Sequence, residues 1–246
     1  MVIKAKNQQK FWKMKMTQEK QAQIDIDGEI TSSEWRDSDT SAAGFRNDLK
    51  ALGDIDVINL HINSPGGEVF EGIAIYNMLK QHKAYINVYV DGLAASIASV
   101  IAMAGDTVYM PENSMLMLHN PSTIVFGNAD DLRKEADDLD KITQSVLTSY
   151  LDKAGDKLEE EQLSEILDNE TWLSASEALD FGLVDEVLQP NKAVACLSAK
   201  FKQFYNHIPT QLVQDKTLMN DSERQKIIDE AKKHKEITKN ILGGIL

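Results

Sequence analysis

Short apolar strands alternate with helical patterns along residues 23–188, and this alternation constrains the fold more than any other feature. Ile, Val and Leu recur at about every second position of residues 55–62, as in a strand with one buried face. Apolar residues then recur at helical spacing over residues 69–80, and residues 86–90 again favour a strand. Such a series predicts an α/β fold built from consecutive strand and helix units.

The rest of the chain completes this pattern. The run of small apolar residues over 94–104 predicts a buried helix, and a long helix with one apolar stripe is expected over 128–150. Further strands are expected over 108–110, 114–119 and 183–187, and shorter helices over 158–167 and 175–181. The pattern changes beyond Pro190. We therefore expect an N-terminal extension (1–22), a core domain (23–190) and a partly helical C-terminal appendage (191–246).

Composition excludes several classes of protein. The net charge is −13, and its acidic excess lies in the central part of the chain, which argues against nucleic-acid binding. No apolar run is long enough for a transmembrane helix, and no apolar segment follows the first lysines as in a secretory signal. The lone Cys196 cannot form an internal disulfide. We expect a cytoplasmic protein with no membrane contact.

Residues 91–98 (DGLAASIA) place Ser96 where a turn passes into the predicted buried helix. A hydroxyl at this point lies near free backbone N–H groups, which favour a developing oxyanion. Taken alone, a serine at a helix start is more often an N-cap than a nucleophile. A catalytic role for Ser96 therefore requires a base and an oxyanion site nearby.

His119 is the best candidate for that base, because it ends a predicted strand at an edge where loops gather. The other histidines lie in a strand, at a helix end or in the appendage (His61, His82, His207, His234). Sequence spacing does not choose among the acids that could orient the base (Asp168, Glu170, Asp180). The Gly66–Gly67 pair, after a strand, offers backbone N–H groups to an anion or to a substrate strand.

Four segments in order resemble the Clp protease proteolytic subunit over about 165 residues. They are INSPGG at 62–67, GLAAS at 92–96, NS to HNP over 113–121, and WLSA to GLVD over 172–185. The resemblance implies a Clp/crotonase-type spiral of ββα units, with residues 128–150 as a handle helix through which two rings meet. It implies a homo-oligomeric serine endopeptidase that hydrolyses polypeptides and needs no cofactor or metal in this chain.

Carried over residue by residue, the resemblance makes Ser96 the nucleophile and His119 the general base. Gly67 and Ile97 would supply the N–H groups of the oxyanion hole. The family has an aspartate where this chain has Glu170, which is one methylene longer. Glu170 is therefore expected as the third triad member, with Asp168 as the alternative.

A second departure concerns the partner. The strand before the Asn-Ser-Pro-Gly-Gly turn carries aromatic residues in the cellular subunits, and these help to dock an AAA+ unfoldase. The corresponding residues here are polar, Asn59 and His61. Together with the appendage, this resembles the Clp-related peptidases of phage and prophage head-assembly modules, which process capsid and scaffold proteins. We therefore expect proteolysis without ATP.

Three alternatives remain at this stage. A general degradative subunit that works with an unfoldase would use the same chemistry. A crotonase-type acyl-CoA enzyme would use backbone N–H groups at Gly67 without a Ser–His pair. A non-catalytic ring component would not react with a serine-directed probe.

Overall fold

The computed structural model describes residues 10–32, 40–190, 205 and 207–209. Backbone contacts divide the chain after Ile208, and every element below belongs to the first unit. The helix expected within residues 191–246 lies outside the described residues.

One eight-stranded sheet forms the centre of the fold. Its main path is β1 (Trp12–Gln18), β2 (Gln21–Asp27), β3 (Val57–Ser64), β4 (Tyr85–Ala95), β5 (Thr107–Pro111) and β8 (Glu186–Leu188). Off this path, β6 (Met115–Leu118) pairs with β4, and β7 (Thr171–Ser174) pairs with β6. The pairs β1–β2 and β6–β7 are antiparallel and the others are parallel. The predicted α/β class is confirmed.

The first strand lies in the segment that the sequence pattern set apart as an extension. β1 pairs with β2 along nearly its whole length, from Trp12 opposite Ile26 to Gln18 opposite Gln21. Trp12 is buried against Phe11 and Phe45, with ring centroids 4.7 and 5.7 Å away. Residues 10–18 therefore contribute to the sheet and to the core.

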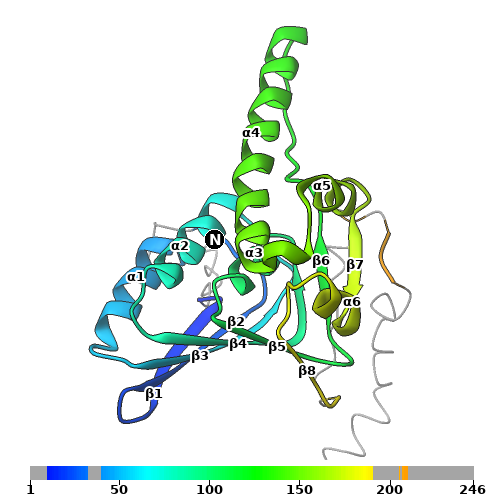
Figure 1. Ribbon diagram of the computed structural model, residues 1–246. Helices are drawn as coiled ribbons and strands as arrows, with labels where there is room; N and C mark the ends of the chain where they lie inside the picture. Colours follow the sequence, from blue (N-terminus) through cyan, green and yellow to red (C-terminus); the bar gives the residue numbers. More distant parts are fainter. Residues whose placement is uncertain (1–9, 33–39, 191–204, 206, 210–246) are drawn as a thin grey trace, which may run out of the picture. The chain divides into compact units, whose positions relative to one another are not determined.

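Alternation along β3 separates a covered face of the sheet from an open one. Ile58, Leu60 and Ile62 are buried, whereas Asn59 and His61 are half-buried on the opposite face. The helices α1 (Ala42–Ala51), α2 (Val69–Lys80) and α3 (Ile97–Ala102) lie on the covered face (Figure 1). The predicted strand over 55–62 and helix over 69–80 are confirmed.

The predicted start of the next helix was wrong. Ala94 and Ala95 belong to β4, and the helix begins only at Ile97. The last residues of β4 pair with β6, while Ala94 also pairs with Ser64 of β3. Because this strand end is enclosed on both faces, its last three residues are all apolar and buried, and no alternation distinguishes it from a buried helix. Ser96 is therefore the joint between a strand and a helix.

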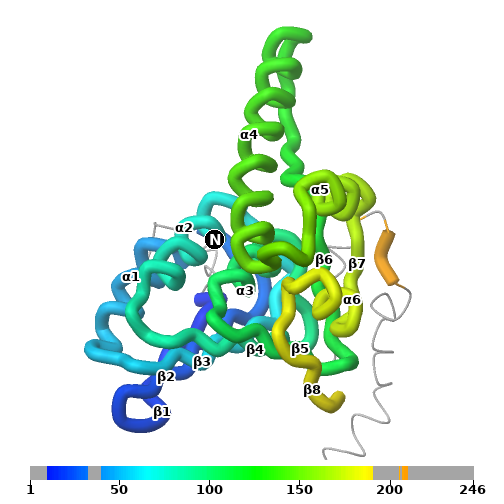
Figure 2. Tube along the Cα trace, viewed as in Figure 1, coloured from blue at the N-terminus to red at the C-terminus, as the bar shows by residue number. Residues whose placement is uncertain are grey.

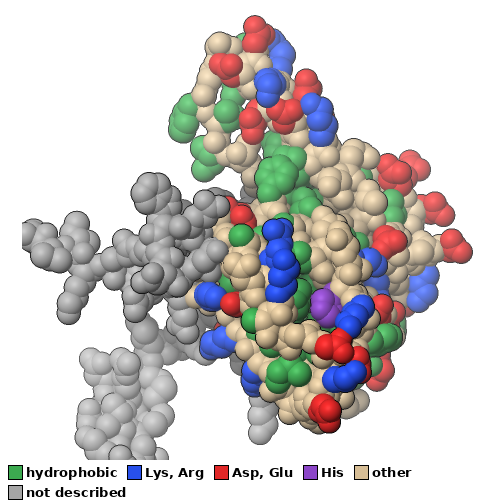
Figure 3. Space-filling view, turned by 90° about the vertical axis from the view of Figure 1, so that its left-hand side faces the viewer, with side chains coloured by type: hydrophobic (Ala, Val, Ile, Leu, Met, Phe, Trp, Pro, Cys, Tyr) green, Lys and Arg blue, Asp and Glu red, His purple; other side chains and the backbone are tan. Residues whose placement is uncertain are grey.

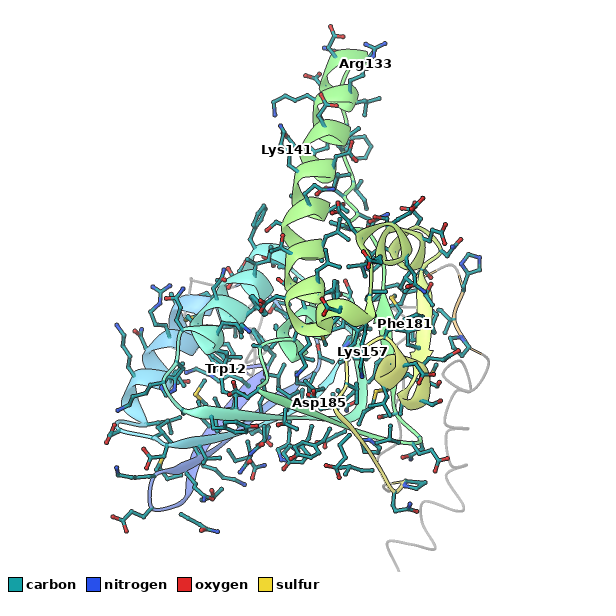
Figure 4. All side chains as sticks on the ribbon, in the orientation of Figure 1. Trp12, Arg133, Lys141, Lys157, Phe181 and Asp185 are labelled. Atoms are coloured by element: carbon teal, nitrogen blue, oxygen red, sulfur yellow. The ribbon has the colours of Figure 1, made fainter. Side chains whose placement is uncertain are left out.

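The long helix α4 (Ala129–Ala154) begins at Asn128, whose side chain caps it in a capping box with Asp131. Its buried residues all lie in the last third of the helix (Val146, Leu147, Ser149, Tyr150, Ala154). The outer part projects away from the sheet, as Figure 2 shows, and Figure 4 labels Arg133 near its outer end and Lys141 farther in. The long helix predicted over 128–150 is confirmed.

The remaining helices are α5 (Glu160–Asp168) and α6 (Ala175–Asp180), preceded by the short 3-10 turn η1 (Gly155–Lys157). Both helices agree with the prediction. The strand expected over 183–187 is displaced to Glu186–Leu188, because Leu183 and Val184 are buried in the turn that precedes it. Within the described part of the chain, no helix combines the length and apolarity needed to cross a membrane.

Candidate active site

Ser96 occupies a strained turn between β4 and α3. Its φ of 54° and ψ of −131° belong to a region that residues other than glycine rarely adopt. Such a backbone costs about 1–3 kcal/mol and persists only where the surroundings hold it. Here the N–H of Ser96 donates to the carbonyl of Met117 in β6 at 2.8 Å. This hydrogen bond to β6 holds the backbone of Ser96 at the joint between β4 and α3.

The hydroxyls of Ser99 and Tyr150 form a buried pair next to the same turn. The Ser99 hydroxyl donates to the carbonyl of Ser96 at 2.6 Å and lies 2.7 Å from the hydroxyl of Tyr150. Tyr150 is a residue of α4, and burial raises the pKa of its hydroxyl, which keeps it protonated. Sequence reasoning placed Tyr150 on the apolar stripe of the helix and missed this contact, because hydrogen-bonding partners 51 residues apart leave no local pattern.

Ser96 and His119 lie together, although 23 residues separate them in sequence. Oγ of Ser96 is 2.8 Å from Nε2 of His119, which follows the last residue of β6. Burial lowers the pKa of His119 below its usual 6.5, while the charge of Glu170 acts in the opposite direction. A neutral imidazole at hydrogen-bond distance from a serine hydroxyl is the arrangement that general-base activation requires.

The two acids that the family resemblance favours for the third position have different surroundings. Glu170 is only 8% exposed and has a positive φ of 50°, and its charge raises the pKa of His119. Asp168 is exposed and accepts a hydrogen bond from the Asn120 side chain at 2.7 Å. Among these two carboxylates, Glu170 is the one that acts electrostatically on the imidazole.

The Gly66–Gly67 turn lies directly against the Ser96 joint. A Cβ on Gly66 would come within 2.8 Å of Cβ of Ser96 and 2.7 Å of the carbonyl oxygen of Ala95, so only glycine permits this approach. On the other side, Ile30 exchanges backbone hydrogen bonds with Gly66 and Glu68. In such a parallel bridge the N–H of the intervening residue, Gly67, points away from Ile30.

Ile97 contributes a second backbone donor to this region. It is the first residue of α3, so its N–H precedes the intrahelical hydrogen bonds of that helix. A Cβ on Gly66 would lie 3.3 Å from this nitrogen, which places the Gly66–Gly67 turn and the start of α3 side by side. The Gly66–Gly67 turn and the first residue of α3 therefore both lie beside Ser96.

A narrow apolar pocket opens beside the serine. Its lining includes Ser96 and His119 together with apolar side chains from α2, α3, α4 and the segment after β6 (Val69, Ile97, Val100, Pro121, Val146, Tyr150). The volume is about 10 Å³, room for roughly one water molecule. A substrate side chain would have to be small and apolar or would have to displace this lining.

A second, larger cleft of about 610 Å³ lies on the open face of the sheet and includes none of the residues above. Its lining is largely polar, with His61 3.1 Å from both carboxylate oxygens of Asp91. The hydrogen bond with Asp91 raises the pKa of His61. The large cleft and the Ser–His pair are therefore separate features.

His61 is not the only ring on that face. It stacks on Tyr89 of β4 with centroids 4.9 Å apart, and Tyr89 stacks on Tyr109 of β5 at the same distance. Asn59 accepts a hydrogen bond from Asn87 at 3.1 Å. Reading β3 alone missed the two tyrosines, because cross-strand neighbours become visible only once the strand register is known.

One further residue of this region was not anticipated. Tyr205 is only 7% exposed, and its ring meets those of His119 and Trp172 edge-on, with centroids 5.5 and 5.8 Å apart. It lies in a stretch with no periodic pattern, which gave no signal for such a contact. No group of three or more potential metal-ligating side chains is found among the described residues.

Comparison with known proteins identifies the family. The Clp protease family model matches residues 16–191. The chain is 36% identical to the ATP-dependent Clp protease proteolytic subunit of Deinococcus radiodurans over 138 residues, which cover 55% of this chain and 66% of that protein. It is 35% identical to the ATP-dependent Clp protease proteolytic subunit 1 of Salinibacter ruber over 146 residues, which cover 57% and 60% of the two chains.

The matched region contains the Ser96 joint, the end of β6 and the Gly66–Gly67 turn, together with Glu170. The alignments span less than two thirds of the length of the two curated relatives. The family model, in contrast, covers well over half of this chain. On that match, this chain belongs to the Clp protease family.

Proposed function

We propose that this protein is a serine endopeptidase that hydrolyses polypeptides through an acyl-enzyme on Ser96. The observation that carries the proposal is the 2.8 Å approach of Oγ of Ser96 to Nε2 of His119, at a serine with a strained backbone. Strain at a residue that also meets a buried base is typical of a nucleophile and serves no evident packing purpose.

In this mechanism His119 removes the proton of the Ser96 hydroxyl as Oγ attacks the substrate carbonyl. The imidazolium then gives that proton to the leaving amine, and water hydrolyses the ester by the same route. Burial supports the first step, because it holds the pKa of His119 low and keeps the base neutral near pH 7. The charge of Glu170 supports the second, because it stabilises the imidazolium.

The N–H groups of Gly67 and Ile97 are proposed as the oxyanion hole. The orientation of Gly67 away from Ile30 and the position of Ile97 at the first turn of α3 both favour this role. Gly66 makes the arrangement possible, because any side chain there would push the two segments apart. We propose Glu170 as the third triad member, since Asp168 binds Asn120 instead.

The proposed task is limited, ATP-independent processing of capsid or scaffold proteins during phage head assembly. The large cleft on the open sheet face supports it, because most of its lining is polar, whereas a docked unfoldase loop would bury apolar anchors in an apolar site. Filling this cleft with an apolar side chain would cost the hydrogen bonds of His61 and Asp91.

A specific observation favours a second candidate, a degradative subunit assisted by an AAA+ unfoldase. The stacked rings of His61, Tyr89 and Tyr109 give the open face an aromatic surface despite the polar residues of β3. Both curated relatives carry "ATP-dependent" in their names. The chemistry at Ser96 is the same in the two candidates, and only the delivery of substrate differs.

Assembly into stacked homo-oligomeric rings is also proposed. The segment beside the outer part of α4 exposes Ile124 and Phe126 by 78% and 94% of their surfaces, and Leu132 of α4 is exposed as well. Figure 3 shows hydrophobic side chains gathered along one edge of this projecting part. An apolar surface of this kind is typical of a protein interface.

The test uses the purified full chain with an unstructured protein substrate, with and without nucleotide. Discrete cleavage products should form without ATP, and Ser96→Ala should form none. Cleavage that requires an AAA+ unfoldase and ATP would favour the second candidate. Undiminished hydrolysis by the Ser96→Ala variant would refute the nucleophile assignment in both.

The crotonase-type and non-catalytic alternatives are less well supported. Acyl-CoA chemistry of that type does not use a serine–histidine pair, whereas this chain brings Ser96 and His119 to 2.8 Å. A purely structural ring component would have no reason to retain the strained backbone of Ser96. Absence of CoA binding would close the first alternative, and reaction with a serine-directed probe would close the second.

A further inference from the structure

The side chain of Tyr205 is enclosed by parts of the candidate active site. Its hydroxyl donates a hydrogen bond to the carbonyl of Pro65, in the turn that precedes Gly66. Its ring packs edge-on against His119 and Trp172, at centroid distances of 5.5 and 5.8 Å. With 7% of its surface exposed, this ring fills the space between the turn, the base and β7.

The same segment also reaches the acid. The backbone N–H of His207 donates to Oε1 of Glu170 at 3.0 Å. Tyr205 thus contacts Pro65 and the ring of His119, and His207 contacts the carboxylate of Glu170. Figure 2 shows the described part of this segment beside β7.

The phenol of Tyr205 is also within reach of the nucleophile. Burial raises the pKa of Tyr205, the charges of Glu170 and Glu29 add to this effect, and a hydrogen bond with the Ser96 side chain opposes it. The phenol therefore stays protonated near neutral pH and can donate its hydrogen to Pro65. A neutral aromatic group with one donor, buried at the nucleophile, resembles a bound substrate side chain.

A substrate cannot use this space while Tyr205 occupies it. A peptide whose carbonyl approaches Ser96 needs access past His119, and its backbone would compete with Tyr205 for the carbonyl of Pro65. The apparent affinity for substrate is then proportional to the fraction of molecules in which Tyr205 is displaced, so a small displaced fraction means weak binding. This consequence follows from occupancy alone and requires no change in the Ser96–His119 pair.

We propose that Tyr205 and His207 act as an internal ligand of the catalytic cleft, with Tyr205 as the anchor, and that they restrain hydrolysis until substrate displaces them. The inference rests on the proposed peptidase function. The cleft between Pro65, His119 and Trp172 is thereby expected to bind a polypeptide segment that carries an aromatic side chain.

The test compares Tyr205→Ala and Tyr205→Phe in the full chain. The second-order rate of Ser96 labelling by a fluorophosphonate should rise about 10- to 100-fold in the Ala variant, because a buried aromatic anchor is lost. The Phe variant keeps the ring and loses only the hydrogen bond to Pro65, so its rate should rise by about two- to tenfold. Tyr85→Ala is the matched control, since Tyr85 is an exposed tyrosine at the start of β4.

A second measurement avoids any change to the protein. A synthetic peptide of residues 201–212 should inhibit labelling of the Tyr205→Ala variant and, more weakly, of the wild type. The same peptide with alanine at the tyrosine position should not inhibit either protein. Equal inhibition by both peptides would overturn the proposed role of Tyr205.

The outcomes separate this inference from the function on which it rests. Labelling of Ser96 at equal rates in wild type and Tyr205→Ala would overturn the internal-ligand proposal and leave the peptidase intact. Slower labelling in a Tyr205→Ala variant with an unchanged thermal unfolding midpoint would also overturn it, because Tyr205 would then assist the reaction. No labelling of Ser96 in any variant would instead refute the proposed function.

Discussion

The Ser96 joint and the outer part of α4 place apolar residues in opposite surroundings. At the joint, the end of β4 and all of α3 are buried, and the strained serine donates a hydrogen bond to the Met117 carbonyl and accepts one from the Ser99 hydroxyl. On the outer part of α4 Leu132 is exposed, and Phe126 beside the helix is 94% exposed. The contacts of the first region all come from this chain, whereas the second region exposes apolar side chains, as is typical of an interaction surface.

This contrast separates the residues expected to act in catalysis from those expected to act in assembly. A residue that must hold an unfavourable backbone needs contacts from its own chain at all times, because about 1–3 kcal/mol of strain would otherwise relax. An interface needs only to be present on the surface. Substitutions at the joint should therefore change chemistry and stability, and those on the outer part of α4 should change assembly.

The largest expected effect concerns Glu170. Glu170→Gln should lower kcat by up to about 10⁴-fold, because the imidazolium loses its stabilising charge. The oligomer should not change if the catalytic site is completed by contacts within one chain. Steady-state hydrolysis of a peptide and light scattering give the two readouts. Asp168→Asn is the matched control and should be near wild type, since Asp168 binds Asn120. The reverse pattern would make Asp168 the third member.

The pH dependence sharpens the same prediction. Hydrolysis requires neutral His119, so kcat/KM should fall as the pH drops through the pKa of this base, which burial places below 6.5. Glu170 raises that pKa, and its loss in Glu170→Gln should move the acid limb to still lower pH. A limb that moves to higher pH would show that Glu170 does not act on His119 through its charge.

The next effect concerns the outer part of α4. Phe126→Asp should weaken assembly about 10- to 100-fold per contact, because it places a charge where an aromatic ring is expected to be buried between subunits. Sedimentation analysis at several concentrations measures the change. Met16→Asp, at another exposed apolar residue on β1, serves as the control. An unchanged oligomer in the Phe126 variant would break the comparison drawn above.

The smallest effect isolates backbone strain at the joint. Both Ser96→Ala and Ser96→Gly remove the hydroxyl, but only glycine adopts a φ of 54° and ψ of −131° without strain. Relief of about 1–3 kcal/mol, less about 0.4–1 kcal/mol of added unfolded-state entropy, should make the Gly variant about 1 kcal/mol more stable than the Ala variant. Chemical denaturation measures this difference. Equal stability would mean that the turn stores no strain.

The sequence was most informative where chemistry depends on short motifs. The Gly66–Gly67 turn, Ser96 and His119 were each predicted from residue type and position, and the structure brings all of them together. The main helices and strands were also predicted, because their apolar residues recur with a clear period.

Prediction failed where neighbours distant in sequence decide the structure. Ala94 and Ala95 were assigned to a helix because an enclosed strand end has no polar face. The positive φ of Ser96 could not be predicted, since only the surrounding contacts impose it. The contacts of Tyr205 and the tyrosine stack beside His61 required the register and the path of the chain.

The most direct test of the central claim is to map the residue that a fluorophosphonate modifies, by mass spectrometry of the digested full-length protein. We predict modification of Ser96 and of no other serine, with a rate that falls sharply in a His119→Ala variant. Modification of a different residue, or an unchanged rate in the absence of His119, would contradict the proposal that these two side chains form the catalytic pair.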